Sequence, residues 1–494
     1  MNLNKLAPVK FSVAALRAST FIALAVLVFC LGCPRAYGDV GVILNESLDT
    51  SMERVTGSGH TAVYFSRICP DSPVKLRLCR AGERGSVLSN YINLGEDQRF
   101  EWNIAPLSLY VYGVQDPRYR PLFGSEKIKE ALEDKYREEI LGSYCATANC
   151  MTSNKAEWRE MVGAGMTRSM YIFVVETTVQ QDLEIIAKFN ALPNENHFNG
   201  MTRNCADFTK DVINTYFPQA AHRDPLNDFG MTSPKAVART FTHYALEHPE
   251  MKLRVIHFSQ SPGTFKRSSE ARSGTEQLYH SKKLLIPMVI FADYALPVAV
   301  ATYTLTGRFN PEHEFEAHPK VEGVQAGDQV SFAKLEGEAP QAAAFAAEDT
   351  PEVEEVVGTP EEWKGYGKAF DTIVAEAVRQ EIIPNRGYLN HVFKRLDEHG
   401  TPSIDSRGAL WMEIPESGAT SKLGLSVSNI FAPESDSRLA YEVLLSRVSH
   451  ILKSPKHSRE TMLEFKQDWA LLQYARARNS TLASAGPSRP RASQ

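Results

Sequence analysis

The segments GHTAVY, at residues 59–64, and NCADF, at residues 204–208, decide how the fold of this chain is interpreted. The first places His60 at the start of a short apolar run of the kind that predicts a strand. The second places Cys205 just before a pattern in which apolar side chains recur at every fourth position from 208 to 216, which predicts a helix. A histidine on a strand and a cysteine at a helix N-terminus are the two parts of a thiol hydrolase.

Further segments extend this pattern into an α+β fold. Strands are predicted at residues 40–44, 60–66, 74–78, 102–114 and 170–175, and helices at 183–190, 205–216 and 234–246. Asn204 is a suitable N-cap for the helix that begins at Cys205. Strands mixed with helices over residues 39–263 predict one α+β catalytic domain with an antiparallel sheet.

The cysteines separate into a set that can pair and one that is left over. Beyond residue 38 the chain keeps five cysteines, and four of them can form two disulfides, for which sequential pairing is the favoured choice. The four are Cys69, Cys79, Cys145 and Cys150. The alternative is a structural zinc site made from the same four residues. Cys205 remains as an odd thiol, which is either used in chemistry or buried as a structural residue.

The chemistry predicted for Cys205 rests on its place at a helix start. Unpaired N–H groups and the helix dipole favour a thiolate there, and the backbone N–H of Cys205 is available to an oxyanion. His60 is the predicted general base, with His197 as a competitor for that role. Asn90 and Asn93 are the candidates to orient the imidazole ring, and Asn93 is the one we select.

The order of histidine and cysteine, with Asn-Cys at the helix start, resembles the circularly permuted papain-like superfamily. That group includes NlpC-type amidases and lecithin:retinol acyltransferase, and the segments also look like a periplasmic domain found beside lacto-N-biosidase chaperones. The resemblance implies a papain-like permuted fold with Cys205 as the nucleophile and His60 as the base. No second histidine lies between His60 and His197, which departs from the acyltransferase pattern.

The first 38 residues predict export. A basic start precedes an apolar stretch at residues 21–32, and Ala36 and Gly38 are small residues at the cleavage positions of a signal peptide. Cys33 offers a lipoprotein site instead, and an uncleaved anchor is the third possibility. Each places the bulk of the chain in the periplasm or cell envelope, where disulfides form.

The remainder of the chain divides into four segments. Residues 284–306 are apolar, and we expect either a membrane span or a buried segment; residues 321–362 hold eleven acidic residues and one lysine, which predicts a linker. Residues 363–478 predict a mostly helical C-terminal domain, and 479–494 a disordered tail. The two histidines of the segment at 313–318 have the wrong spacing for a zinc protease, so we interpret the segment as a polar loop.

Composition narrows the function classes. A net charge of −5 and a pI near 6.3 argue against a nucleic-acid partner. No cofactor and no metal are predicted. The sequence therefore predicts an exported thiol hydrolase or transferase that acts on cell-wall peptide or on lipid. The alternative is a non-enzymatic envelope assembly or binding protein on a degenerate papain-like fold.

Overall fold

The computed structural model describes residues 38–48, 59–91, 100–141, 160–280, 301, 303–318, 359–416, 419–454 and 459–484. The predicted signal peptide, apolar segment and acidic linker therefore lie almost entirely outside the described residues, as do Asn93, Cys145 and Cys150. None of the helices in the described ranges has both the length and the apolar character that a bilayer span requires.

A six-stranded antiparallel sheet forms the centre of the N-terminal region. Its order is β6-β5-β2-β1-β7-β8. The strands are β1 (Gly38–Asn45), β2 (His60–Phe65), β5 (Ser86–Ser89), β6 (Asn103–Pro106), β7 (Met170–Thr177) and β8 (Arg254–Phe258). Strand β1 is buried along nearly its whole length, since layers cover both faces of the sheet, and this explains its continuous apolar sequence. The prediction of an α+β fold with an antiparallel sheet is confirmed.

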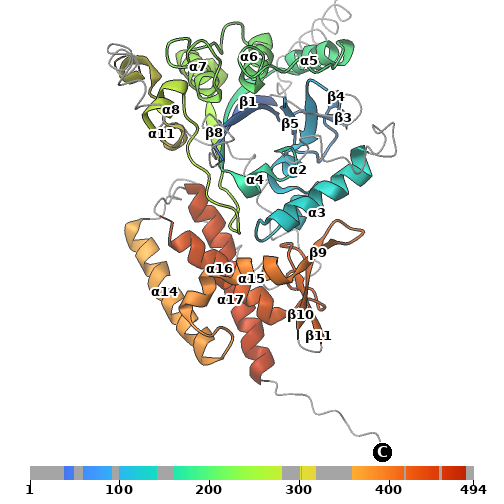
Figure 1. The fold of residues 1–494 in the computed structure, drawn as a ribbon, viewed down its shortest axis with the longest axis vertical. Helices are drawn as coiled ribbons and strands as arrows, with labels where there is room; N and C mark the ends of the chain where they lie inside the picture. Colours follow the sequence, from blue (N-terminus) through green and yellow to red (C-terminus); the bar gives the residue numbers. More distant parts are fainter. Residues whose placement is uncertain are drawn as a thin grey trace, which may run out of the picture.

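Three helices cover one face of the sheet. They are α5 (Val179–Ala191), α6 (Cys205–Tyr216) and α7 (Pro234–Glu247), which lie above the sheet in the view of Figure 1. Each begins at a residue whose side chain accepts a backbone N–H of the first turn: Thr178, Asn204 and Ser233. Val212 and Ile213 of α6 are buried in the core between this layer and the sheet.

The opposite face carries α2 (Leu107–Tyr112), α3 (Glu126–Tyr136) and α4 (Ala164–Thr167). The prediction of one strand over 102–114 is wrong, because β6 ends at Pro106 and α2 follows directly. Helix α2 ends at Gly113, whose φ of 78° is a left-handed conformation that glycine adopts at little cost. A short apolar run does not by itself separate a strand from a buried helix.

A hairpin at the edge of the sheet carries the described disulfide. Strands β3 (Ile68–Ser72) and β4 (Lys75–Leu78) pair antiparallel, and Cys69 and Cys79 are bonded with their Cα atoms 4.8 Å apart. The Cys79 N–H donates to the carbonyl of Arg67 at 2.8 Å, which extends the pairing past β4 and brings the second cysteine back to the first.

Short elements complete this region: η1 (Pro117–Tyr119), η2 (Arg137–Leu141), η5 (Pro249–Met251), α8 (Gly274–His280), η6 (Tyr303–Gly307) and α11 (Pro311–Ala317). The interpretation of 313–318 as a loop is wrong, because α11 covers most of it. Asn310 caps this helix and Pro311 occupies its first turn, where a proline lacks no needed N–H. His318 Nε2 lies 3.1 Å from Glu314 Oε2, so the pair is joined one helical turn apart.

The C-terminal region is mostly helical, as predicted, but it also contains a small sheet. Its elements are α14 (Pro360–Arg379), η8 (Arg386–Asn390), α15 (Val392–His399), β9 (Thr401–Ile404), β10 (Leu410–Glu416), β11 (Ala419–Gly424), α16 (Ser437–Leu452) and α17 (Arg459–Ser484). The sheet order is β11-β10-β9. Helix α17 continues to Ser484, past the boundary at 478 where a disordered tail was expected.

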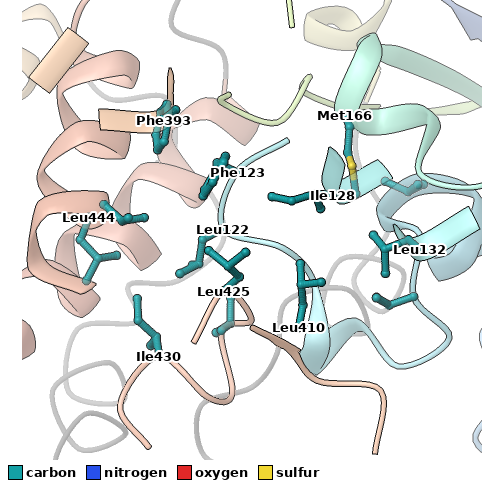
Figure 2. Packing of buried hydrophobic residues seen from close by; sticks show 14 of the residues in the cluster. Leu122, Phe123, Ile128, Leu132, Met166, Phe393, Leu410, Leu425, Ile430 and Leu444 are labelled. Atoms are coloured by element: carbon teal, nitrogen blue, oxygen red, sulfur yellow. The ribbon is translucent and has the colours of Figure 1, made fainter. Parts of the chain in front are cut away.

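The two regions share one hydrophobic core, which Figure 2 shows at close range. Phe123 is fully buried and stacks on Phe393 of α15 with ring centroids 5.1 Å apart. The Leu122 N–H donates to the carbonyl of Leu425 at 2.7 Å, and Arg447 of α16 donates to the carbonyl of Leu122. The chain between α2 and α3 is therefore held inside the C-terminal region.

Candidate functional site

Cys205 occupies the first position of α6. The Asn204 side chain accepts the N–H groups of Ala206 at 2.9 Å and Asp207 at 3.0 Å, and the Asp207 carboxylate receives the Asn204 N–H in return. This reciprocal cap fixes the first helical turn. Among the described residues Cys205 is a free thiol, and it is partly exposed.

Asp207 anchors this helix start to the rest of the region. Its side chain is buried and accepts Thr232 Oγ1 at 2.6 Å and Arg223 Nη2 at 2.7 Å. Asn204 Nδ2 also donates to the Thr232 carbonyl at 3.0 Å. Cys205 therefore sits on a turn held by a charged, hydrogen-bonded network, which limits the positions its sulfur can take.

The sulfur of Cys205 lies against the start of β2. Backbone N–H groups of Thr61, Ala206 and Cys205 itself favour the thiolate, and so does the charge of Arg168. Burial outweighs them and raises the pKa of the Cys205 thiol. The expectation that the helix N-terminus would leave this thiol with a lowered pKa is therefore wrong. Burial destabilises the thiolate more than the N–H groups at the helix start stabilise it.

His60 lies at the same end of β2, one residue from Thr61. It is 6% exposed, its Nε2 is 3.0 Å from Ser89 Oγ, and its ring stacks on Tyr91 with centroids 4.1 Å apart. Burial lowers the pKa of His60 to about 3, and the charge of Arg168 acts in the same direction. The imidazole is therefore neutral near pH 7.

The two groups approach from opposite faces of the sheet. His60 shares a face with Ala62 and Tyr64, which pack in the core that continues into the C-terminal region. Helix α6 packs on the other face, against Val63 and Phe65. Both groups reach the same end of β2, but within the described residues no hydrogen bond joins the His60 ring to the Cys205 sulfur.

A buried polar cluster surrounds the histidine. Tyr110 accepts Asn45 Nδ2 at 2.8 Å, and burial raises the pKa of Tyr110 to about 12. Arg168 is 6% exposed and pairs with Glu160. Lys129 Nζ donates to the Val162 carbonyl at 2.5 Å, and burial lowers the pKa of this lysine to about 8.

Sequence reasoning missed the partners of His60. Ser89, Tyr91 and Arg168 are not among the predicted site residues. Ser89 and Tyr91 nevertheless flank Asn90, one of the two asparagines predicted as candidates to orient the ring. Asn90 is buried but donates from Nδ2 to the Glu101 carbonyl at 2.6 Å rather than contacting the ring. Residues 86–89 follow Gly85 and form the fully buried strand β5, which pairs with β2. Predicting this strand would have placed Ser89 beside β2.

The remaining candidates lie elsewhere. His197 is exposed on the loop that precedes α6. Cys69 and Cys79 form the disulfide of the β3–β4 hairpin, at the sheet edge away from β1. Comparison with family models, curated proteins and solved structures finds no match to this chain.

Proposed function

We propose that this protein is a thiol hydrolase or transferase that cleaves an amide or an ester through Cys205 and His60. The observation that carries the proposal is the position of the Cys205 sulfur, at a capped helix N-terminus and against the N–H of Thr61, the residue next to His60. A strand that bears the histidine and a later helix that bears the cysteine, packed on one antiparallel sheet, support a permuted papain-like fold.

The resting pair is uncharged, because burial disfavours both the thiolate and the imidazolium. In the proposed reaction the sulfur attacks the carbonyl carbon as the thiol proton passes to His60. The Cys205 N–H is positioned to donate to the resulting oxyanion. The bond to the leaving amine or alcohol then breaks as His60 returns the proton to it. Water or an amine resolves the acyl-thioester.

The hydrogen bond to Ser89 is compatible with this role. A neutral imidazole carries one N–H and one acceptor nitrogen. The tautomer that donates from Nε2 to Ser89 Oγ leaves Nδ1 as the acceptor for the thiol proton. Ser89, rather than Asn93, is then the residue that orients the ring.

The substrate class follows from the predicted compartment. An exported chain meets cell-wall peptide, which is rich in amides, and this is the first substrate we propose. Lipid ester is the second, and it draws on the apolar segment at 284–306, through which the protein would associate with a membrane.

The second candidate function is a non-enzymatic envelope assembly or binding protein on the same fold. The raised pKa of the Cys205 thiol favours it, because burial of the sulfur lowers its reactivity.

Alkylation by iodoacetamide at neutral pH separates the two functions. If the hydrolase proposal is right, His60 accepts the thiol proton as Cys205 is alkylated, so His60→Ala slows labelling about tenfold, and His197→Ala, the exposed neighbour, does not change the rate. Incubation with an activated ester then adds one acyl group to Cys205, visible by mass spectrometry and lost in Cys205→Ser. Labelling at the same rate in wild type and both histidine variants supports the binding protein instead.

A further inference from the structure

The C-terminal region contains a cavity far in sequence from Cys205. Its volume is about 170 Å³, and it lies between α14, η8 and α16. Phe370, Trp363 and Ser449 are buried and form the floor, while Arg386 and Lys453 are exposed at the rim. An engineered cavity of about 150 Å³ holds a benzene ring. The space therefore suits a ligand with one small ring.

Ser449 is a polar group on this floor without a protein partner. It is 3% exposed, it lines the cavity, and its Oγ makes no hydrogen bond within the described residues. A buried serine in a helix usually bonds back to a carbonyl one turn earlier, and a buried hydroxyl that bonds to nothing is unfavourable. Because this oxygen is itself buried, the hydroxyl must first turn about the Cα–Cβ bond toward the cavity, where a ligand atom can accept its hydrogen bond.

The rim is cationic. Lys453 follows Ser449 by one helical turn of α16, so the two side chains share a face. Its Nζ donates to Asn390 Oδ1 at 2.7 Å, which uses one of the three N–H groups of the ammonium. Arg386 is paired with Asp371, and two cations therefore face a single carboxylate. Burial lowers the pKa of Lys453 and the nearby charge of Arg386 acts the same way, which an incoming anion would oppose.

We propose that this cavity binds a small monocarboxylate with one compact ring, of the size of benzoate. The carboxylate accepts from Ser449 Oγ and from Lys453, and the ring packs on Phe370 and Trp363. Asp371 at the same rim disfavours a second negative charge, so the site selects a monoanion over a dianion.

The test is calorimetric titration of the full-length protein at neutral pH with benzoate, benzamide and inorganic phosphate. We expect benzoate to bind with a millimolar dissociation constant or tighter, and benzamide, which has the same shape without the charge, to bind at least about tenfold more weakly. Phosphate is expected to bind more weakly than benzoate. It has no ring to pack on Phe370 and Trp363, and Asp371 repels the second negative charge of its dianion.

Two glycines of α14 provide a matched pair of variants. A Cβ built at Gly367 or at Gly365 meets nothing within 4 Å, but only Gly367 lines the cavity. Gly367→Leu should fill the space and abolish benzoate binding, while Gly365→Leu should leave it unchanged. Since leucine favours a helix more than glycine does, neither variant should unfold the protein. Lys453→Met should weaken binding about tenfold and Ser449→Ala about threefold to fivefold.

The proposal is overturned if benzoate at millimolar concentration gives no binding, which would mean that the cavity holds water only. It is equally overturned if benzamide or phosphate binds as tightly as benzoate, or if Gly365→Leu and Gly367→Leu reduce binding to the same extent.

Discussion

The two faces of the central sheet are stabilised by different parts of the chain. Within the described residues, the face under α5, α6 and α7 packs against residues that precede 316. The face under α2, α3 and α4 shares its core with α14, α15, α16 and α17 of the C-terminal region. Cys205 belongs to the first face and His60 to the second. A site made from both depends on two cores at once, and each can be perturbed separately.

The largest effect is expected from Phe123→Ala, which acts on the shared core. Phe123 is fully buried against Phe393, so its removal should lower the free energy of unfolding by about 4 kcal/mol. Urea denaturation followed by fluorescence measures this loss. Leu192→Ala, at a site 55% exposed, is the control and should change stability by less than about 0.5 kcal/mol.

The same denaturation experiment tests whether the sheet and the C-terminal region unfold as one unit because they share a hydrophobic core. Suppose that the C-terminal region and the sheet of Phe123→Ala unfold in two separate transitions, and that the transition of the sheet keeps its wild-type midpoint. The two regions would then not be one cooperative unit.

A smaller loss of folding stability is expected when the pH is lowered. One buried histidine from each region, His60 and His450, contributes to it. Burial lowers the pKa of His60 to about 3 and that of His450 to about 4. An unfolded histidine titrates near 6.5, so below that pH the unfolded state binds protons that the folded state does not, and stability falls as the pH falls. For His60 the loss between about pH 6.5 and pH 5 is about 2 kcal/mol.

The measurement is the stability difference between these two pH values in wild type, His60→Gln and His450→Gln. Each variant should lose less stability on acidification than wild type, and by a similar amount, because the folded pKa of each histidine lies below pH 5. Equal acid sensitivity in all three proteins would mean that neither histidine is held in its neutral form by burial.

The smallest effect comes from the helix caps on the self-contained face. Asn204→Ala removes the N-cap of α6, and Thr178→Ala removes the N-cap of α5. Each should lower the free energy of unfolding by about 1 kcal/mol. Only Asn204→Ala loosens the turn around Cys205. Because burial is what raises the pKa of the Cys205 thiol, greater exposure should speed its alkylation about threefold at neutral pH.

Thr178→Ala is the matched control and should leave alkylation unchanged. Slower alkylation in Asn204→Ala would show instead that the ordered helix start, and not burial, dominates the acidity of this thiol.

Much of the secondary structure was predictable because it depends on local patterns. The apolar run of β1, the cap at Ser233 with Pro234 behind it, and the four-residue spacing of α6 each specify an element from neighbouring residues. The boundary at Pro106 was not predictable, since 102–114 is equally apolar on both sides of it. The helix at 311–317 was missed because its capping asparagine was not recognised.

The sequence by itself determined that Cys205 begins a helix and that His60 begins a strand, because caps and hydrophobic periodicity act over a few residues. Only the tertiary structure decided the ionisation of the two groups and the partner of the imidazole. Burial depends on layers contributed by distant segments, and it raises the pKa of the thiol and lowers that of the histidine against what the local motif favours. The tertiary fold likewise brought Ser89 to His60 and drew the segment at 122–123 into the C-terminal region.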